Sequence, residues 1–186
     1  MEREIIDVEI EGIAPLLQHN ALASLEGLKG GNTRRRPTRD NTEEWRNFMY
    51  QQDGKLVHPS DAIYSCLVQA SREFKADRRR TMQRLVTASV FPVGKWMTIK
   101  GKKEPDYVHE SVAVNPTTKG RIVVYRPAFK EGWRMTFQLE LTDPESVSFA
   151  KIKEILDYAG LKVGLGSWRP RYGRFTVVKF ERKKMG

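Results

Sequence analysis

The strongest chemical signal in the chain lies between Ala159 and Phe175, where glycines, basic side chains and aromatic rings alternate and no acidic residue occurs. Glycines let the backbone approach a ligand closely, cations hold phosphates, and aromatic rings offer flat faces on which bases stack. This combination predicts contact with a phosphate backbone and unpaired bases. Duplex readout is less favoured, because no helix carries a base-reading set. The candidate binding residues here are Lys162, Gly164, Gly166, Trp168, Arg169, Arg171, Tyr172 and Arg174. The structural alternative is a tight turn with Trp168 in the core.

Two further basic runs fall in regions without a clear helix or strand pattern. The first contains Arg34, Arg35, Arg36 and Arg39, and the second contains Arg78, Arg79 and Arg80. Trp45 and Trp96 lie near them in sequence and are further candidates for base stacking. We expect the two basic runs and the glycine-rich segment to line a single groove.

The overall charge supports an anionic partner. The chain has 33 Lys and Arg residues against 23 Asp and Glu residues, a net charge of +10, and a pI near 9.8. Such an excess of positive charge indicates the kind of partner and not the fold. Nucleic acid is the first candidate partner, and an anionic membrane surface is the second. The remaining alternative is a basic surface that binds nothing.

Several classes are excluded or disfavoured. No apolar run approaches the roughly 18 residues of a membrane-spanning helix, and the polar start at Met1 is unlike a secretory signal. The single cysteine, Cys66, excludes an internal disulfide and indicates a cytoplasmic protein, with core packing as its expected role. No Gly-Lys-Ser/Thr sequence ends a phosphate loop, and no His-x-His or His-Glu-x-x-His pair is present. We therefore expect no cofactor and no metal.

Apolar periodicity predicts five strands and two helices. The strands are expected at 3–11, around Val112 and Val114, at 121–126, at 133–141 and at 174–181. A helix over 60–75 is expected to be capped by Ser60, and its apolar face comprises Ile63, Leu67, Ala70 and Phe74. A second helix is expected to be capped by Asp143, to begin at Pro144 and to end at Gly160.

This order predicts an α+β fold. The short connection between 121–126 and 133–141 favours an antiparallel hairpin. Two strand-helix-strand halves then give a ferredoxin-like (RRM-type) βαββαβ antiparallel sheet with both helices on one face. We expect a single domain over 1–186, with core elements at 3–11, 60–75, 121–141 and 144–181. Two long basic insertions, 12–58 (thumb-like) and 76–120 (finger-like), interrupt it, and a short helix is expected near 42–50.

The element order and the loop Gly164-Leu-Gly-Ser-Trp-Arg-Pro-Arg-Tyr-Gly173 resemble the RAMP superfamily, the repeat-associated proteins of CRISPR systems. The two basic insertions are similar to those of the backbone subunits that polymerise along guide RNA. The resemblance implies that Gly164, Gly166, Trp168, Arg169 and Arg171 lie against RNA. The chain is short for such a subunit, so a stand-alone or virus-borne relative is an alternative.

The leading hypothesis is a sequence-tolerant binder of single-stranded RNA or DNA, with RNA favoured, which assembles as a homo-oligomer or as a subunit of a ribonucleoprotein complex. Some RAMP relatives cleave RNA without a metal, using a histidine close behind the first strand. His19 lies in that region, so a metal-independent endoribonuclease is the first alternative. A structural or interaction subunit whose basic face meets acidic protein is the second.

Overall fold

The computed structural model describes residues 3–20, 41–114 and 119–183, and it divides the strands between two sheets. In chain order the elements are β1 (Glu4–Gly12), β2 (Leu16–Leu17), η1 (Asn41–Phe48), β3 (Gln51–Gln52), β4 (Lys55–Pro59), α2 (Ser60–Ala70), η2 (Ser71–Glu73), α3 (Gln83–Ser89), β5 (Val90–Ile99), β6 (Tyr107–Val114), β7 (Arg121–Phe129), β8 (Arg134–Leu141), α4 (Phe149–Lys162) and β9 (Phe175–Arg182). The larger sheet has the order β3-β4-β5-β8-β1-β9, and the smaller has the order β2-β7-β6.

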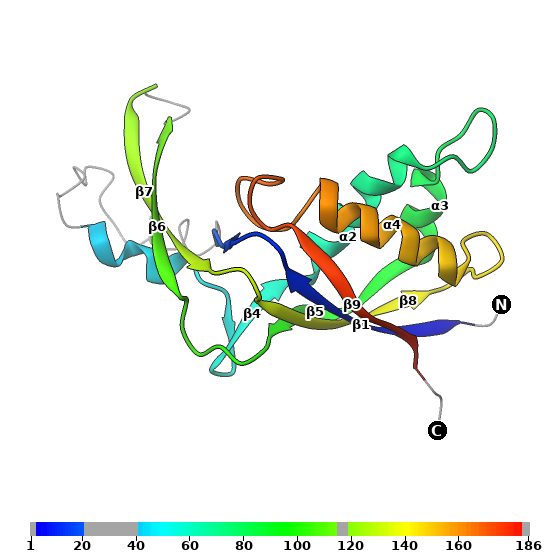
Figure 1. Ribbon diagram of the computed structural model, residues 1–186, viewed down its shortest axis with the longest axis horizontal. Coiled ribbons are helices and arrows are strands. Elements are labelled where there is room, and N and C mark those ends of the chain that lie inside the picture. The colour runs from blue at the N-terminus through cyan, green and yellow to red at the C-terminus, as the bar shows by residue number, and fades with distance from the viewer. Residues whose placement is uncertain (1–2, 21–40, 115–118, 184–186) are drawn as a thin grey trace, which may run out of the picture.

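The ferredoxin-like core is confirmed. Strands β5, β8, β1 and β9 are antiparallel neighbours, and α2 and α4 cover one face of their sheet (Figure 1). The alternation predicted for β1 places Ile6, Val8 and Ile10 in the core. The facing helices contribute Ile63, Leu67, Ile152 and Leu156, among others, so one apolar layer joins the sheet to its helices.

The predicted hairpin between 121–126 and 133–141 is wrong. Strand β7 pairs with β6 and β2, whereas β8 pairs with β1 and β5. The second core strand is therefore β5, which the sequence analysis placed within the insertion 76–120. Pro92 and Gly94 lower the strand propensity of that segment, and Gly94 lies in a register irregularity between Val93 and Thr98, where β5 bends.

Both predicted insertions therefore contribute strands to the sheets. The region 12–58 contributes β2 to the small sheet, and its β4 adds to the core sheet beside β5. The predicted short helix is present as the 3₁₀ helix η1. Of the predicted insertion 76–120, β5 belongs to the core sheet, and β6 pairs with β7 in a hairpin that projects away from the larger sheet (Figure 1). Strand β7, predicted as a core strand, is therefore part of this projection and not of the core sheet.

The helix boundaries also differ from the predictions. Helix α2 ends at Ala70, so Phe74 lies beyond it, and Pro59 rather than Ser60 occupies its N-cap position. Helix α4 begins at Phe149, where the Ser148 side chain accepts a hydrogen bond from the Lys151 N–H. Asp143 instead stabilises the preceding turn by accepting a hydrogen bond from the Ser146 N–H.

Helix α4 also continues past Gly160, which was expected to end it. Gly160 is required for another reason, because a Cβ there would lie 2.2 Å from the Phe175 carbonyl oxygen. Strand β9 follows, and the register shift opposite Glu9 and Ile10 alters its facing pattern. Phe180 therefore packs on the helix side, with its ring centroid 4.7 Å from that of Phe149, although strict alternation along the strand would place it on the side opposite Phe175.

Within the described residues, no helix is long and apolar enough to cross a membrane.

Candidate nucleic-acid interface

The glycine loop, residues 163–174, connects α4 to β9 and is fixed by backbone hydrogen bonds to the segment that follows β1. The Ser167 N–H donates to the Leu17 carbonyl at 3.0 Å, and the Gly173 N–H donates to the Pro15 carbonyl at 2.8 Å. Gly166 and Gly173 have positive φ angles, and a Cβ at Gly173 would lie 1.7 Å from the Leu165 carbonyl oxygen. The glycines therefore hold a compact loop against the protein body.

This loop presents two aromatic rings close to each other. The ring centroids of Trp168 and Tyr172 are 6.3 Å apart. Trp168 has a positive φ of 59°, and 42% of its surface is exposed, so the alternative that it belongs to the core is wrong. An exposed indole on a fixed backbone is a suitable surface for stacking a base.

The β6–β7 hairpin supplies polar groups to the same place. The His109 ring centroid lies 5.2 Å from that of Tyr172 and 5.9 Å from that of Trp168. The guanidinium carbon of Arg126 lies 5.6 Å from the Trp168 ring centroid, within cation–π range. We call His109, Arg126, Trp168 and Tyr172 the junction site, because it joins the glycine loop to the hairpin.

Arg126 dominates the electrostatics of the junction site. Only 8% of its surface is exposed, and its pKa is lowered by burial. Its Nη1 donates to the Ser111 hydroxyl at 2.8 Å, but its Nε has no hydrogen-bond partner in the described part of the chain. Among the described residues no carboxylate pairs with it. A buried cation without a counter-ion is costly, so this position favours an anionic ligand.

The positive charge of Arg126 also acts on two histidines, His19 and His109. The pKa of His109 is lowered by burial and then by Arg126 and Arg171, and the pKa of His19 is lowered by burial and then by Arg126. The His109 Nε2 and the His19 Nδ1 are buried, and neither has a hydrogen-bond partner within residues 3–20, 41–114 and 119–183. The His19 ring also stacks on Phe48 at 4.5 Å. Both imidazoles are therefore held neutral near pH 7.

The structure brings together most of the residues predicted in the glycine loop. Arg171 lies over the ring of Tyr172 at 5.6 Å, and Arg169 is exposed beside them in the loop. Lys162 is exposed at the end of α4. The Arg174 Nε is buried without a partner. Arg34, Arg35, Arg36 and Arg39 lie outside the described residues.

The two aromatic candidates from the insertions make ring contacts of their own. Trp96 is on β5, where Lys95 covers its ring at 5.0 Å and Tyr50 lies 6.0 Å away. Trp45 is in η1, where Arg46 covers its ring at 4.8 Å. No ring contact joins either of them to Trp168 or Tyr172 within the described part of the chain.

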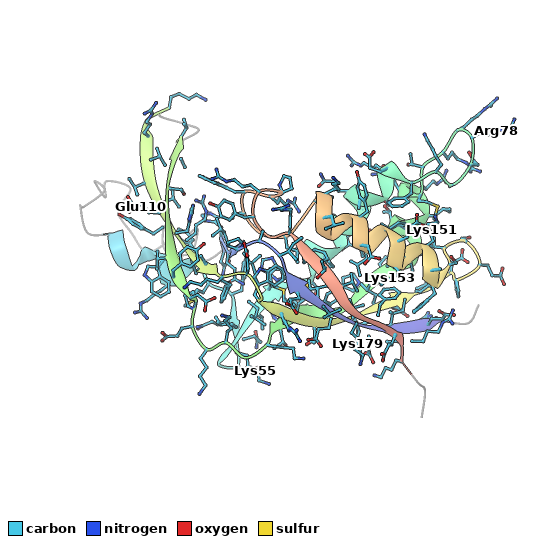
Figure 2. The ribbon with its side chains drawn as sticks, viewed as in Figure 1. Lys55, Arg78, Glu110, Lys151, Lys153 and Lys179 are labelled. Atoms are coloured by element: carbon cyan, nitrogen blue, oxygen red, sulfur yellow. The ribbon has the colours of Figure 1, made fainter. Side chains whose placement is uncertain are left out.

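The single groove predicted for the three basic regions is wrong for Arg78, Arg79 and Arg80. These residues lie on the loop between α2 and α3. Figure 2 shows Arg78 at the opposite end of the molecule from Glu110, which marks the β6–β7 hairpin. The loop with these arginines follows α2 and precedes α3, and α3 leads directly into β5. The loop therefore lies away from the β6–β7 hairpin.

The face of the larger sheet that the helices leave uncovered differs from the junction site in how its charges are paired. It contains a hollow of about 510 Å³, lined partly by Asp7, Glu9 and Lys100. The Lys100 Nζ pairs with a Glu9 oxygen at 3.0 Å, and the Gln138 Nε2 donates to Asp7 at 2.7 Å. Lys100 on this face is thus paired with an acidic residue, whereas Arg126 at the junction site has no such partner among the described residues.

Sequence reasoning missed His109 and Arg126. Their contacts depend on the β6–β7 register, in which His109 faces Arg126, and on the position of the hairpin against the glycine loop. The local signal was weak: a charged residue at the end of a β-branched run, directly before Pro127.

Comparison with known proteins identifies the fold alone. No family model matches the chain, and no curated protein matches it. A solved structure, "Cryo-EM structure of the Type III-B Cmr-beta bound to cognate target RNA", contains a chain that superposes with a TM-score of 0.52 at 14% identity. The match covers 98% of this chain and 61% of that chain, so the protein spans about three fifths of the length of its structural neighbour.

Proposed function

We propose that the protein binds single-stranded RNA at the junction site. The observation that carries this proposal is the buried Arg126 guanidinium, which has no carboxylate partner among the described residues and lies 5.6 Å from the centroid of the exposed Trp168 ring. A phosphate would complement the charge of Arg126, and an unpaired base would stack on Trp168. The fold shared with a chain of an RNA-bound complex supports RNA over DNA as the natural ligand.

The proposal includes limited sequence preference. Stacking accepts any base, and phosphate contacts carry no sequence information. The nearby basic residues Lys162, Arg169 and Arg171 are exposed and would follow the backbone on either side of the stacked base. Affinity should consequently fall steeply with salt, because several counter-ions are released on binding.

Fluorescence anisotropy with labelled oligouridine and oligothymidine of about 15 nucleotides tests this proposal, at roughly 50 mM and 200 mM salt. Arg126→Gln and Trp168→Ala should weaken binding, whereas Lys55→Gln, on β4 and away from the site, should not. Undetectable binding at the lower salt, or equal loss in all three variants, would contradict the proposal.

We further propose membership of the RAMP superfamily and a role as a repeating subunit along a nucleic-acid strand. The fold supports the former, and β9 supports the latter, because it is an edge strand whose outer side is unpaired in the described chain. A non-closing head-to-tail contact would then form filaments. Light scattering after size-exclusion chromatography measures the oligomeric state of the protein, with and without oligouridine of increasing length. A strict monomer in every case would exclude repeated assembly.

A metal-independent endoribonuclease is the second candidate, favoured by the position of His19 and His109 near Arg126. A neutral imidazole can take the proton of a 2′-hydroxyl as that oxygen attacks phosphorus. The bond from phosphorus to the 5′-oxygen then breaks, a 2′,3′-cyclic phosphate forms, and the 5′-oxygen takes a proton from water and leaves as a hydroxyl group. A guanidinium can stabilise the charge that develops. Hairpin RNA incubated with the protein in EDTA should be cleaved if this activity exists, and His19→Ala and His109→Ala would identify the base. If the RNA stays intact when it is fully bound, the protein binds RNA and does not cleave it.

A further inference from the structure

The loop between α2 and α3 is a second concentration of positive charge, and its conformation is fixed internally. The Asp77 Oδ1 accepts hydrogen bonds from the N–H groups of Arg79 and Arg80 at 2.8 and 2.9 Å. The Asp77 Oδ2 accepts from the Arg80 Nε at 2.7 Å. The pKa of Asp77 is lowered, chiefly by the hydrogen bond from the Arg79 backbone. The acidic residue at the tip is therefore already satisfied.

The other arginines of the loop remain available. Arg78, Arg79 and Arg84 are exposed, and within the described chain their side chains form no hydrogen bond or ion pair. Figure 2 shows Arg78 pointing into solvent at the end of the molecule. We call residues 76–85 the arginine loop. It offers guanidinium groups on a backbone that needs little further ordering.

Beside these charges is a hollow of about 430 Å³. Its lining residues are Ala76, Asp77, Arg80, Thr81, Gln83, Arg84 and Leu85. Ala76 and Leu85 provide apolar surface in this lining, beside Arg80 and Arg84. Such a surface suits a ligand that has both negative charge and one small aliphatic group.

The aromatic content separates this site from the junction site. None of the described residues that line the hollow is aromatic. Phe74, which precedes the loop, already has two partners: its ring packs edge-on against Tyr158 at 5.5 Å, and the Lys151 Nζ lies over it at 5.6 Å. Single-stranded nucleic acid sites combine cations with stacking rings, so an acidic peptide is the better match here.

We propose that the arginine loop docks an acidic peptide segment of a partner protein, one that carries an aliphatic side chain between its carboxylates. The carboxylates pair with Arg78, Arg79 and Arg84, which offer planar forks matched to carboxylate geometry. The aliphatic side chain enters the hollow against Ala76 and Leu85. Because the arginine loop and the β6–β7 hairpin lie at opposite ends of the molecule, the protein can hold RNA and this partner at the same time.

Anisotropy of a fluorescein-labelled Glu-Glu-Leu-Glu-Glu peptide tests the proposal on the full chain. The triple variant Arg78→Gln, Arg79→Gln, Arg84→Gln should weaken peptide binding by at least about tenfold, a loss of about 1.4 kcal/mol. The variant Lys55→Gln, Lys103→Gln, Lys119→Gln loses the same formal charge at exposed positions elsewhere and should change it less than about twofold. Replacing the leucine of the peptide by serine should also reduce affinity.

Three results would overturn the proposal: no saturable binding of the leucine peptide, equal losses in the two triple variants, or indifference to the leucine. The same variants are titrated with oligouridine. If the arginine substitutions abolish RNA binding and leave the peptide unaffected, the loop is a nucleic-acid surface and the proposal fails. Failure of RNA binding by the wild-type protein would contradict the junction site without affecting the peptide result.

Discussion

The guanidinium carbon of Arg126 lies 5.6 Å from the centroid of the Trp168 ring, although 42 positions separate them in the sequence (168 − 126). Arg126 comes from a strand of the small sheet, and Trp168 comes from the loop that precedes the last strand of the large sheet. Their contact makes the two sheets contribute to one surface. Four predictions follow from this geometry and from the surrounding core.

Trp168→Ala should reduce affinity for oligouridine by about 1–3 kcal/mol, the usual contribution of one base stacked on an aromatic ring. The thermal midpoint should change little, because 42% of the side chain is exposed in the free protein. Trp168→Phe keeps an aromatic face and should recover part of the affinity. Anisotropy and thermal unfolding measure the two effects, and unchanged affinity in Trp168→Ala would remove the stacking role.

Arg126→Gln should weaken RNA binding by about 1.5–3 kcal/mol, the range for hydrogen bonds to charged groups. Stability should hold or increase, because the substitution removes a buried cation that lacks an acidic partner in the described chain. A role confined to packing predicts the opposite combination, with lower stability and normal RNA affinity. Denaturant titration and anisotropy on the same protein separate the two roles.

Protein stability should fall as the pH drops below neutrality, because His58 is buried. Its pKa is lowered from 6.5 to about 4 by burial, and its Nδ1 lies 3.2 Å from the Gln18 Nε2. A lowered pKa favours the neutral form in the folded state. Its stabilisation is therefore complete above pH 6.5, declines as the pH falls toward 4, and amounts to about 3 kcal/mol in total.

About 2 kcal/mol of that stabilisation should be lost between pH 7 and pH 5. Urea unfolding at both pH values measures the loss, and His58→Asn should reduce it even if the variant is less stable at pH 7. His19 and His109 contribute in the same direction, since their pKa values are also lowered. Stability that is constant over this interval would contradict the assignment.

Gly173→Ala should disrupt the glycine loop, because the new Cβ would lie 1.7 Å from the Leu165 carbonyl oxygen at a positive φ. Gly54→Ala is the matched control, since Gly54 also has a positive φ but nothing within 4 Å of the added carbon. The control isolates the backbone cost of about 1–2 kcal/mol, and Gly173→Ala should exceed it. Equal thermal midpoints in both variants would show that the loop can relax.

Local sequence patterns determined much of the core. Alternation defined β1 and β8 because each has one face in the core and one facing away from it, and spacing defined the apolar face of α2. The glycine loop was recognisable because unusual backbone geometry requires a particular residue at Gly173. These features depend on residues that are close together in the chain, and so they can be predicted from the sequence without the tertiary structure.

Tertiary structure decided which strands pair and which side chains meet. A strand pattern at Arg121–Phe129 does not reveal its partner, and antiparallel pairing with β6 was as compatible with it as pairing with β8. That choice brought His109 and Arg126 to Trp168 and left Arg78 at the far end of the molecule. The net charge of +10 was evident in the composition, but its separation into two surfaces depends on long-range packing.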